Sequence, residues 1–350
     1  MKNIRVLVVD DSPTVCQVLT KGLSRAPGIE VIGTAPNPYV ARDMIVKDPP
    51  DVMTLDIEMP RMDGLTFLRK LMKHFPLPIV VVSTLTTDGN AKAMEALASG
   101  AVDVVEKNIR PERVNDFMLE MVRKVRSAAA AKVSSRSLAI RDRAQAQVQP
   151  VRPTLDDPGS HIVAVGSSTG GCEALQTIIT RLPANAPGMV VVQHMPPGFT
   201  TQMAVRLDTQ SAVTVREAEG GEFLEPGLVL IAPGDRHLLI RKSGSRYRTE
   251  LRDGPRVSLH KPSVNVLFRS VAQAAGADAV GVILTGMGKD GAAGMLEMKQ
   301  AGAVNIGQDE ESCVVYGMPR EAFELGALEH VVPLDKITEK ICRVVSRTRV

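Results

Sequence analysis

Short apolar runs alternate with amphipathic segments through the first 126 residues of the chain. The first run, residues 4–9, is followed by Ser12 and Pro13, which suit the N-cap and the first position of a helix. Further strand-like runs lie near residues 30–35, 51–55, 78–83 and 102–106. Helical periods lie near residues 38–47, 64–74 and 90–99. This alternation predicts a parallel sheet with helices on both faces.

The same alternation returns in the second half of the chain. Strands are predicted near residues 161–165, 188–193, 213–218, 227–232, 279–284 and 303–307. Helices are predicted near residues 172–181, 199–208, 262–275, 290–301 and 335–347. Two further strand-like runs, Arg236–Ile240 and Arg246–Leu251, flank Ser-Gly-Ser and indicate a hairpin added to a second doubly wound domain.

The two halves are joined by a segment of different composition. An amphipathic helix is predicted up to residue 126, and the next residues are rich in Ala, Ser, Arg, Gln and Pro. Such a segment cannot bury enough apolar surface to order itself. We therefore expect a domain over residues 1–126, a flexible basic linker over 127–158 and a second domain over 159–350.

Composition narrows the class of protein. The 350 residues carry a net charge of +3, too small to require a nucleic-acid or membrane partner. The linker's basic residues could bind nucleic acid, but no aromatic residues accompany them, so a solvated tether is favoured. No run approaches the ~18 apolar residues of a membrane span, and the beginning lacks a signal-peptide pattern. The four cysteines are far apart, so neither a zinc site nor a disulfide framework is indicated, and a cytoplasmic location is expected.

Polar residues follow successive predicted strands of the first domain, where ligands bind in parallel sheets. Asp10 and Asp11 end the first strand, Asp56 the third, Ser83 the fourth and Lys107 the fifth. Converging carboxylates suit Mg²⁺, which favours one or two carboxylates plus waters and a phosphate. The hydroxyl and the ammonium would complete a pocket for a phosphoryl group. The alternative, solvated loop acids, explains one such residue better than five.

Residues 3–124 resemble the receiver domain of two-component response regulators, a flavodoxin-like fold. The resemblance rests on Val-Val-Asp-Asp-Ser, on Leu-Asp-Ile-Glu-Met-Pro-Arg-Met-Asp-Gly, and on the Ser83/Lys107 pair. It implies phosphorylation of Asp56 by a histidine kinase, with Asp10 and Asp11 helping to hold Mg²⁺. One departure concerns Asn108, which stands where the family usually has proline.

The second domain opens with an apolar run that leads into Gly-Ser-Ser-Thr-Gly-Gly and a helical pattern. Ser168, between Gly166 and Gly170, matches the G-x-S-x-G turn that exposes a serine nucleophile at the end of a sheet. The same turn could cradle a phosphate with backbone N–H groups or be an ordinary connection. A nucleophilic serine also needs a base and an acid.

Two later strand ends supply these groups. His194 follows the next strand, and Asp290 follows the strand predicted near 279–284. Serine, histidine and acid from loops at one sheet edge fit a catalytic triad. His194 could instead be a packing histidine, and Asp290 could be the N-cap of the helix that follows it. The order Ser, His, Asp differs from that of α/β-hydrolases.

The whole chain resembles the chemotaxis response regulator protein-glutamate methylesterases, the CheB family. The resemblance rests on Gly-Ser-Ser-Thr-Gly-Gly, Gln-His-Met-Pro, Ile-Ala-Pro-Gly, Lys-Pro-Ser-Val-Asn-Val-Leu-Phe and Leu-Thr-Gly-Met-Gly-Lys-Asp-Gly. It implies a Rossmann-like esterase domain with Ser168 as nucleophile, His194 as base and Asp290 as acid. The substrates implied are glutamate methyl esters, and particular glutamines, on chemoreceptors.

This resemblance also sets expectations for regulation and partners. The unphosphorylated receiver would block the esterase until Asp56 is phosphorylated. The esterase reaction itself would need no cofactor, and the backbone N–H groups near Thr169 or Met287 are candidates for the oxyanion hole. We expect the protein to be a monomer that associates with receptor arrays without inserting into the membrane. The rivals are a response regulator whose second half only binds nucleic acid or a partner, and a hydrolase of small esters.

Overall fold

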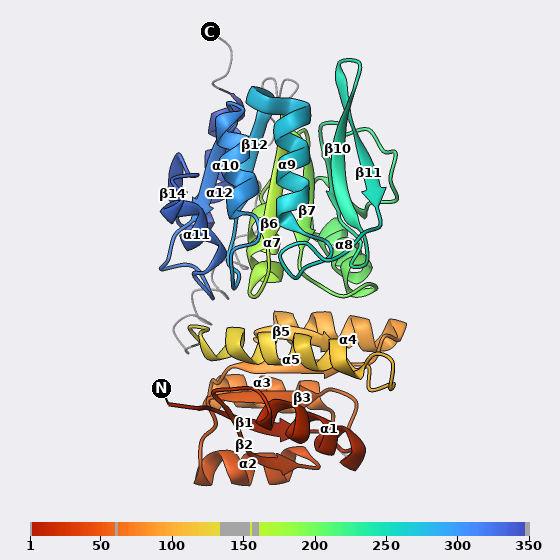
Figure 1. The fold of residues 1–350 in the computed structure, drawn as a ribbon, viewed down its shortest axis with the longest axis vertical. Coiled ribbons are helices and arrows are strands. Elements are labelled where there is room, and N and C mark those ends of the chain that lie inside the picture. Colours follow the sequence, from red (N-terminus) through yellow and green to blue (C-terminus); the bar gives the residue numbers. More distant parts are fainter. Residues whose placement is uncertain (1, 60–61, 134–154, 156–160, 347–350) are drawn as a thin grey trace. The chain divides into compact units, whose positions relative to one another are not determined.

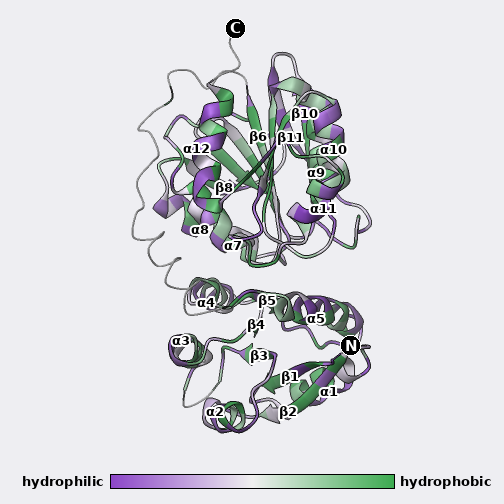
Figure 2. Cartoon of the chain, turned by 90° about the vertical axis from the view of Figure 1, so that its left-hand side faces the viewer, coloured by the Kyte–Doolittle hydropathy of each residue, from purple (hydrophilic) through white to green (hydrophobic). Residues whose placement is uncertain are grey.

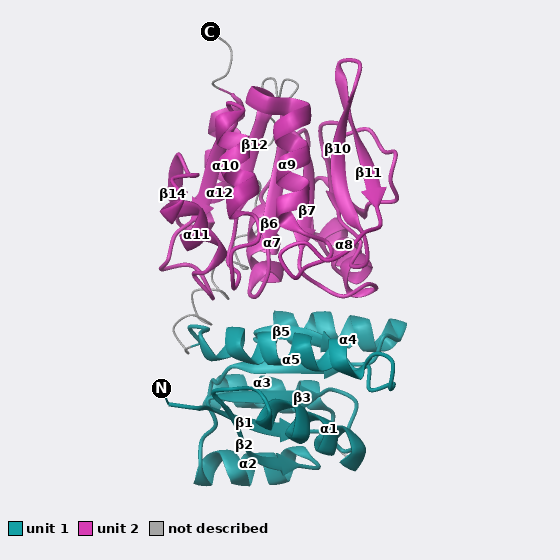
Figure 3. Ribbon diagram, viewed as in Figure 1, with its two compact units in different colours: residues 1–141 teal, residues 142–350 magenta. Residues whose placement is uncertain are grey.

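The computed structural model describes residues 2–59, 62–133, 155 and 161–346. Within it the chain forms two compact units, residues 1–141 and 142–350, which are described separately (Figure 3). Most of the linker predicted over 127–158 lies outside the described residues. Leu155 is an exception, because it is buried and its N–H and C=O both bond the side chain of Asn185, each at 2.8 Å.

The first unit contains five strands and five helices within its described residues (Figure 1). In chain order they are β1 (Ile4–Val9), α1 (Pro13–Ser24), β2 (Ile29–Ala35), α2 (Pro38–Lys47), β3 (Val52–Asp56), α3 (Gly64–His74), β4 (Ile79–Ser83), α4 (Thr87–Ala98), β5 (Asp103–Glu106) and α5 (Val114–Ala129). The predicted alternation of strands and helices is confirmed element by element.

The five strands are all parallel, in the order β2-β1-β3-β4-β5. This is the flavodoxin-like order, in which ligands bind beyond the carboxyl ends of the central strands. Helices cover both faces of the sheet, and Figure 2 shows the strands mostly hydrophobic and the helices two-sided. Serine, asparagine, aspartate and threonine cap four of the helices, at Ser12, Asn37, Asp63 and Thr86.

The helix α5 holds one contact that periodicity did not indicate. Lys124 lies among its apolar residues yet is buried, and its ammonium is 2.8 Å from a carboxylate oxygen of Asp103 on β5. A buried charge requires a partner of this kind. The helix also runs to Ala129, three residues into the predicted linker.

The second unit follows the same construction. In chain order its elements are β6 (Ile162–Ser167), α7 (Gly171–Ile179), β7 (Gly188–Gln193), α8 (Phe199–Gln210), β8 (Thr214–Glu217), β9 (Leu228–Ile231), β10 (His237–Ser243), β11 (Arg246–Arg252), α9 (Val264–Ala275), the 3₁₀ turn η1 (Gly276–Asp278), β12 (Ala279–Ile283), α10 (Ala292–Gln300), β13 (Val304–Gln308), α11 (Met318–Glu324), β14 (His330–Val332) and α12 (Leu334–Val345).

Seven parallel strands make the main sheet of this unit, in the order β14-β13-β12-β6-β7-β9-β8. Without β8 this is the Rossmann order, with β6 as the central first strand. The chain leaves β6 in one direction across the sheet and later returns to its other side through β12, so the strand order reverses between them. Ligands bind at such a switch point, beyond the carboxyl ends of the strands.

The predicted hairpin is present as β10 and β11, which form an antiparallel sheet of their own and pack on α9 (Figure 1). In Figures 1 and 2 the helices α9, α10 and α11 cover one face of the main sheet, and α7, α8 and α12 cover the other. The short helix α11 was not predicted, because seven residues carry too little periodicity. None of the described helices has both the length and the apolar character needed to cross a bilayer.

Candidate active site

Ser168 and His194 follow neighbouring strands of the second unit. The parallel strands β6 and β7 pair in a register that sets Ser167 opposite Gln193. The residues that come next, Ser168 and His194, are therefore neighbours. The His194 amide donates to the Ser167 carbonyl at 3.1 Å. Ser168 and His194 are each 5% exposed. The parallel pairing thus brings a hydroxyl and an imidazole to one edge of the sheet.

The turn that carries Ser168 depends on glycine and on the neighbouring strand end. Gly170 has a φ of 78°, in the left-handed region, and a Cβ there would lie 2.6 Å from Val314. The Ser168 amide donates to the Thr285 carbonyl at 3.0 Å, which ties the turn to the end of β12. The serine is therefore held between two strand ends instead of on a free loop.

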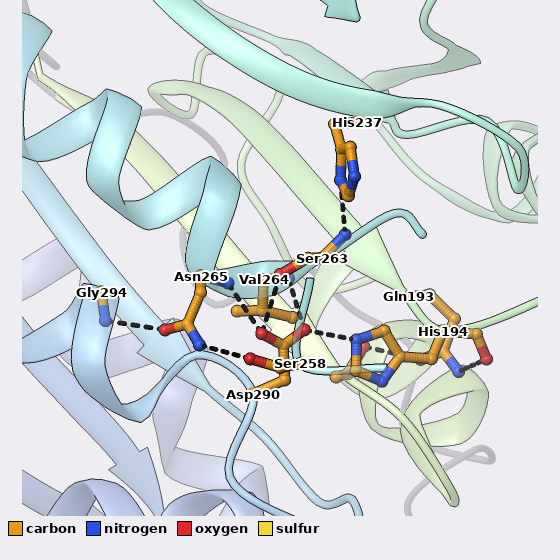
Figure 4. A network of polar contacts seen from close by, with 10 residues as sticks. Gln193, His194, His237, Ser258, Ser263, Val264, Asn265, Asp290 and Gly294 are labelled. Atoms are coloured by element: carbon orange, nitrogen blue, oxygen red, sulfur yellow. Dashed lines mark hydrogen bonds and ion pairs between the residues drawn. The ribbon is translucent and has the colours of Figure 1, made fainter. Parts of the chain in front are cut away.

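Asp290 reaches the same edge from the loop after β12 (Figure 4). Its Oδ2 lies 2.9 Å from Nε2 of His194, and both side chains are buried. A carboxylate can only accept, so Nε2 carries the proton of this hydrogen bond. In the familiar serine-protease triad the acid binds Nδ1 and Nε2 acts on the serine. Here Nε2 contacts the acid, and Nδ1 is the other ring nitrogen of His194.

Three further donors surround Asp290, and all come from the beginning of α9. The Ser263 hydroxyl and the Asn265 amide donate to Oδ1 at 2.8 and 3.1 Å, and the Val264 amide donates to Oδ2 at 2.8 Å. Burial opposes ionisation, but the hydrogen bonds from His194 and these donors outweigh it and hold the pKa of Asp290 below its ordinary value.

These contacts correct the alternative that Asp290 is the N-cap of its own helix. The N-cap of α10 is Gly291, and the Asp290 carboxylate caps α9 from outside that helix. The first amides of α9 have no partners within the helix, and its dipole favours a negative charge at this end. One carboxylate therefore caps a helix and orients an imidazole.

Two further histidines contact residues of this site. The His260 ring stacks on the His194 ring with centroids 3.6 Å apart and planes 5° apart. His237 bonds the Ser263 amide through Nδ1 at 3.2 Å. Both come from the hairpin and the loop that follows it. The motif Lys-Pro-Ser-Val-Asn-Val contributes to the family resemblance, but its spacing along the sequence does not link it to Asp290.

The two oxyanion candidates lie on different loops at this edge. Thr169 is buried in the serine turn, whereas Met287 is 39% exposed in the loop after β12. That loop is tied to the chain before α11, because Gly286 donates to the Val315 carbonyl at 3.0 Å and accepts from Met318 at 2.8 Å. A Cβ on Gly286 would lie 2.7 Å from the Ser168 Cβ, so glycine allows the loop to approach the serine closely.

The first unit brings its strand-end acids together. Carboxylate oxygens of Asp10, Asp11 and Asp56 lie within 4.8 Å of one another. The Lys107 ammonium is 2.6 Å from Asp56 and 2.9 Å from Asp10. Burial raises the pKa of Asp10 although Lys107 opposes the shift. Burial also disfavours the Lys107 ammonium, but the two carboxylates raise its pKa above the ordinary value.

Ser83 and Asn108 are the remaining positions noted at this edge. The Ser83 side chain is buried and its hydroxyl donates to the Gly89 carbonyl at 3.0 Å, at the beginning of α4. Asn108 donates to the Glu106 carboxylate at 2.9 Å. Ser83 thus connects the end of β4 to the helix that follows it.

Comparison with known proteins places both units. Residues 163–341 match the model of the CheB methylesterase family, and residues 6–118 match that of the response regulator receiver domain. The catalytic domain of the CheB methylesterase of Thermotoga maritima superposes on the second unit with a TM-score of 0.52. It is 44% identical and covers 53% of this chain and 99% of that chain.

Two curated relatives match nearly the whole chain. A protein-glutamate methylesterase/protein-glutamine glutaminase of Anaeromyxobacter dehalogenans (strain 2CP-C) is 54% identical over 98% of this chain and 95% of its own. Another, of Syntrophus aciditrophicus (strain SB), is 50% identical over 99% of this chain and 100% of its own. The chain therefore belongs to the CheB methylesterase family and carries a receiver domain in front of the esterase domain.

Proposed function

We propose that this chain is a phosphorylation-controlled protein-glutamate methylesterase in which Ser168, His194 and Asp290 perform the hydrolysis. The observation that carries the proposal is the buried 2.9 Å contact between His194 and Asp290 at the strand ends next to Ser168. The substrates are methyl esters of glutamates on the cytoplasmic part of chemoreceptors, so the protein works in the cytoplasm. The relatives named above support this choice of substrate.

The reaction proceeds in two halves. Asp290 holds the proton on Nε2 of His194, which leaves Nδ1 to take the proton of the Ser168 hydroxyl. The serine oxygen attacks the ester carbonyl, methanol leaves with a proton from the imidazolium, and a glutamyl–serine ester remains. Water, deprotonated by the same histidine, attacks this ester and releases the glutamate. With a glutamine side chain the same steps release ammonia in place of methanol.

The tetrahedral oxyanion requires hydrogen-bond donors. The backbone N–H groups of Thr169 and Met287 are proposed for this role, because their loops meet at the serine turn. One such donor lowers the barrier by about 3 kcal/mol in other enzymes. The close approach of Gly286 to Ser168 supports the participation of the second loop.

Phosphorylation of the receiver domain controls the activity of the esterase domain. Asp56 accepts a phosphoryl group from a histidine kinase of the chemotaxis system, and the clustered oxygens of Asp10, Asp11 and Asp56 would hold Mg²⁺. The metal would neutralise charge on the phosphoryl oxygens. Lys107 already contacts the Asp56 carboxylate, and Ser83 adjoins α4, so both are placed to respond to the new charge.

Phosphorylation shifts the population of receiver states toward those that permit receptor access to the esterase. The phosphoryl group carries about two negative charges and replaces the single charge of the Asp56 carboxylate at the end of β3, where the Lys107 ammonium now offsets part of the charge of Asp10 and Asp56. The chain acts as a monomer on receptor arrays without entering the membrane.

Methanol release from methylated receptor membranes tests the proposal. Ser168→Ala should lower kcat by a factor on the order of 10⁴ or more, because the nucleophile is lost. The matched control is Ser167→Ala, the adjacent serine, whose hydroxyl donates to Gln193 at 2.6 Å. It should keep kcat within about tenfold, since one neutral hydrogen bond contributes ~1 kcal/mol. Methanol release by Ser168→Ala at the wild-type rate would remove the serine from the mechanism.

A further inference from the structure

His237 is a buried histidine whose two ring nitrogens both have defined partners. Figure 4 shows its contact with Ser263. Its Nδ1 accepts from the Ser263 amide at 3.2 Å, and its Nε2 lies 3.0 Å from the Pro255 carbonyl oxygen. An amide N–H can only donate and a carbonyl can only accept. The ring is therefore neutral, with its proton on Nε2.

The partner of His237 is also a partner of Asp290. The Ser263 hydroxyl donates to Oδ1 of Asp290 at 2.8 Å, while its amide donates to His237. Ser263 is fully buried and precedes the first residue of α9. A rotation of this residue would move its hydroxyl and the Val264 amide together, and both contact Asp290. The orientation of Ser263 thus sets two of the four hydrogen bonds to the carboxylate.

His237 fixes this residue from the base of the hairpin. It is the first residue of β10, opposite Arg252 in β11, and Pro255 follows the hairpin. The hairpin contacts α9 at a second place, where the Ile240 amide donates to the Ser270 hydroxyl at 2.9 Å. That contact lies seven residues further along α9 than Ser263, about two helical turns. The hairpin therefore has one contact at the cap of α9 and a separate one at its middle.

We propose that His237 is a positioning residue of the esterase, acting through Ser263 on Asp290 and thereby on the imidazole of His194. Its acceptor nitrogen holds the Ser263 amide so that the hydroxyl faces Oδ1 and the carboxylate presents Oδ2 to the histidine. The inference rests on the proposed function, because it assigns Asp290 and His194 to the reaction. It gives the added hairpin a part in catalysis.

Two amide variants of His237 distinguish the role of its accepting nitrogen, Nδ1, from that of its donating nitrogen, Nε2. His237→Asn can place its Oδ1 near the position of Nδ1 and still accept from Ser263. His237→Gln can place its amide nitrogen near Nε2 and donate to Pro255, but it has no acceptor next to the Ser263 amide. Ser270→Ala is the matched control, because it breaks the other hydrogen bond between the hairpin and α9.

The full-length protein is assayed with a phosphodonor on methylated receptor membranes. His237→Gln should lower kcat by about 10²-fold with KM unchanged, the size of effect that a misplaced catalytic group produces. His237→Asn and Ser270→Ala should stay within a few-fold of wild type. Thermal unfolding of each variant establishes that the comparison is made between folded proteins.

A second measurement needs no substrate. In protein carrying isotope-labelled histidine, the downfield NMR signal of the proton between His194 and Asp290 is identified by its loss in Asp290→Asn. It should shift or broaden in His237→Gln and persist in His237→Asn and Ser270→Ala.

Two results would overturn the positioning role. One is equal kcat in the two His237 variants. The other is a loss of kcat in Ser270→Ala as large as that in His237→Gln. Ser168→Ala is assayed in parallel, and wild-type methanol release by that variant would instead overturn the proposed function. The NMR comparison then still decides whether His237 orients the His194–Asp290 pair.

Discussion

The Asp290 carboxylate performs two tasks that reinforce each other. It accepts from the first amides of α9 and from Nε2 of His194, and burial removes competition from water. The helix end stabilises its negative charge, and in the proposed mechanism this charge keeps the imidazole in the tautomer that the base requires. The requirements of folding and of catalysis are therefore met by the same four hydrogen bonds.

Asp290→Asn should impair both tasks. The amide offers a donor where Ser263, Val264 and His194 also donate, so at least one buried donor loses its partner at a cost of ~1–3 kcal/mol. The imidazole loses its preferred tautomer, and kcat should fall by about 10⁴-fold, as for the corresponding change in a serine protease. Urea unfolding and methanol release measure the two effects.

The lowered pKa of Asp290 adds a pH signature to this variant. The folded-state pKa is below the ordinary value, so the carboxylate stabilises the fold above about pH 4 and loses this contribution as the pH falls through the lowered pKa. The difference in unfolding free energy between wild type and Asp290→Asn should therefore shrink below pH 4. The exposed Asp235→Asn serves as the control. A difference that does not change with pH would show that the charge is not involved.

At the scale of elements, the site depends on how closely α9 approaches β6. A Cβ on Gly166 would lie 2.2 Å from a methyl group of Val264, and a Cβ on Gly291 would lie 2.6 Å from the same group. Val264 is fully buried, and its amide is one of the donors to Asp290. Glycines on β6 and on the Asp290 loop therefore let the capped end of α9 fit between them.

Gly166→Ala tests this packing. The added methyl group should displace Val264 and destabilise the protein by about 1–3 kcal/mol, the usual cost of overpacking, and kcat should fall because the Val264 amide moves. Val264→Ala removes the clashing methyl groups, so the double variant should be more stable than the sum of the single changes predicts. Additive losses in stability and no recovery of kcat would mean that the two positions are independent.

The strands and helices were predictable because their signal is local. The Ile162–Ser167 run and the glycine turn after it place Ser168 at a strand end, and His194 and Asp290 follow in the same way. Parallel pairing then brings strand ends together whatever the intervening sequence. This part of the site follows from hydrophobic pattern and topology alone.

The environment of Asp290 was not predictable, because its partners are distant in sequence and ordinary in composition. Ser263 precedes Asp290 by 27 positions and resembles any helix N-cap. His237 and His260 come from the hairpin, whose docking on α9 depends on tertiary packing that periodicity does not encode. The Asp290 N-cap hypothesis was wrong about which helix is capped, because local patterns cannot indicate a cap supplied by another segment.

At the scale of the whole molecule, two parallel-sheet domains use the same edge for different chemistry. In the receiver, three clustered acids and Lys107 suit a metal and a phosphoryl group. In the esterase domain, a single acid is bound by neutral donors and a histidine, which suits proton transfer. In the proposed control, the charge added to the receiver site changes the population of receiver states, and the esterase site itself needs no change in its chemistry.

Removal of residues 1–150 is the decisive change at this scale. The crystallised Thermotoga maritima relative consists of the catalytic domain alone and matches the second unit over 99% of its length, so the truncated chain should fold. If the receiver restrains the esterase, as proposed, methanol release by the truncated chain should exceed that of the unphosphorylated full-length protein. Asp56→Asn in the full-length chain is the companion variant, and a phosphodonor should not raise its activity although it raises that of wild type. A truncated chain slower than the unphosphorylated full-length protein would instead mean that the receiver activates the esterase. The ratio of wild-type to Asp56→Asn activity in the presence of the phosphodonor would then measure how much activation is lost without phosphorylation.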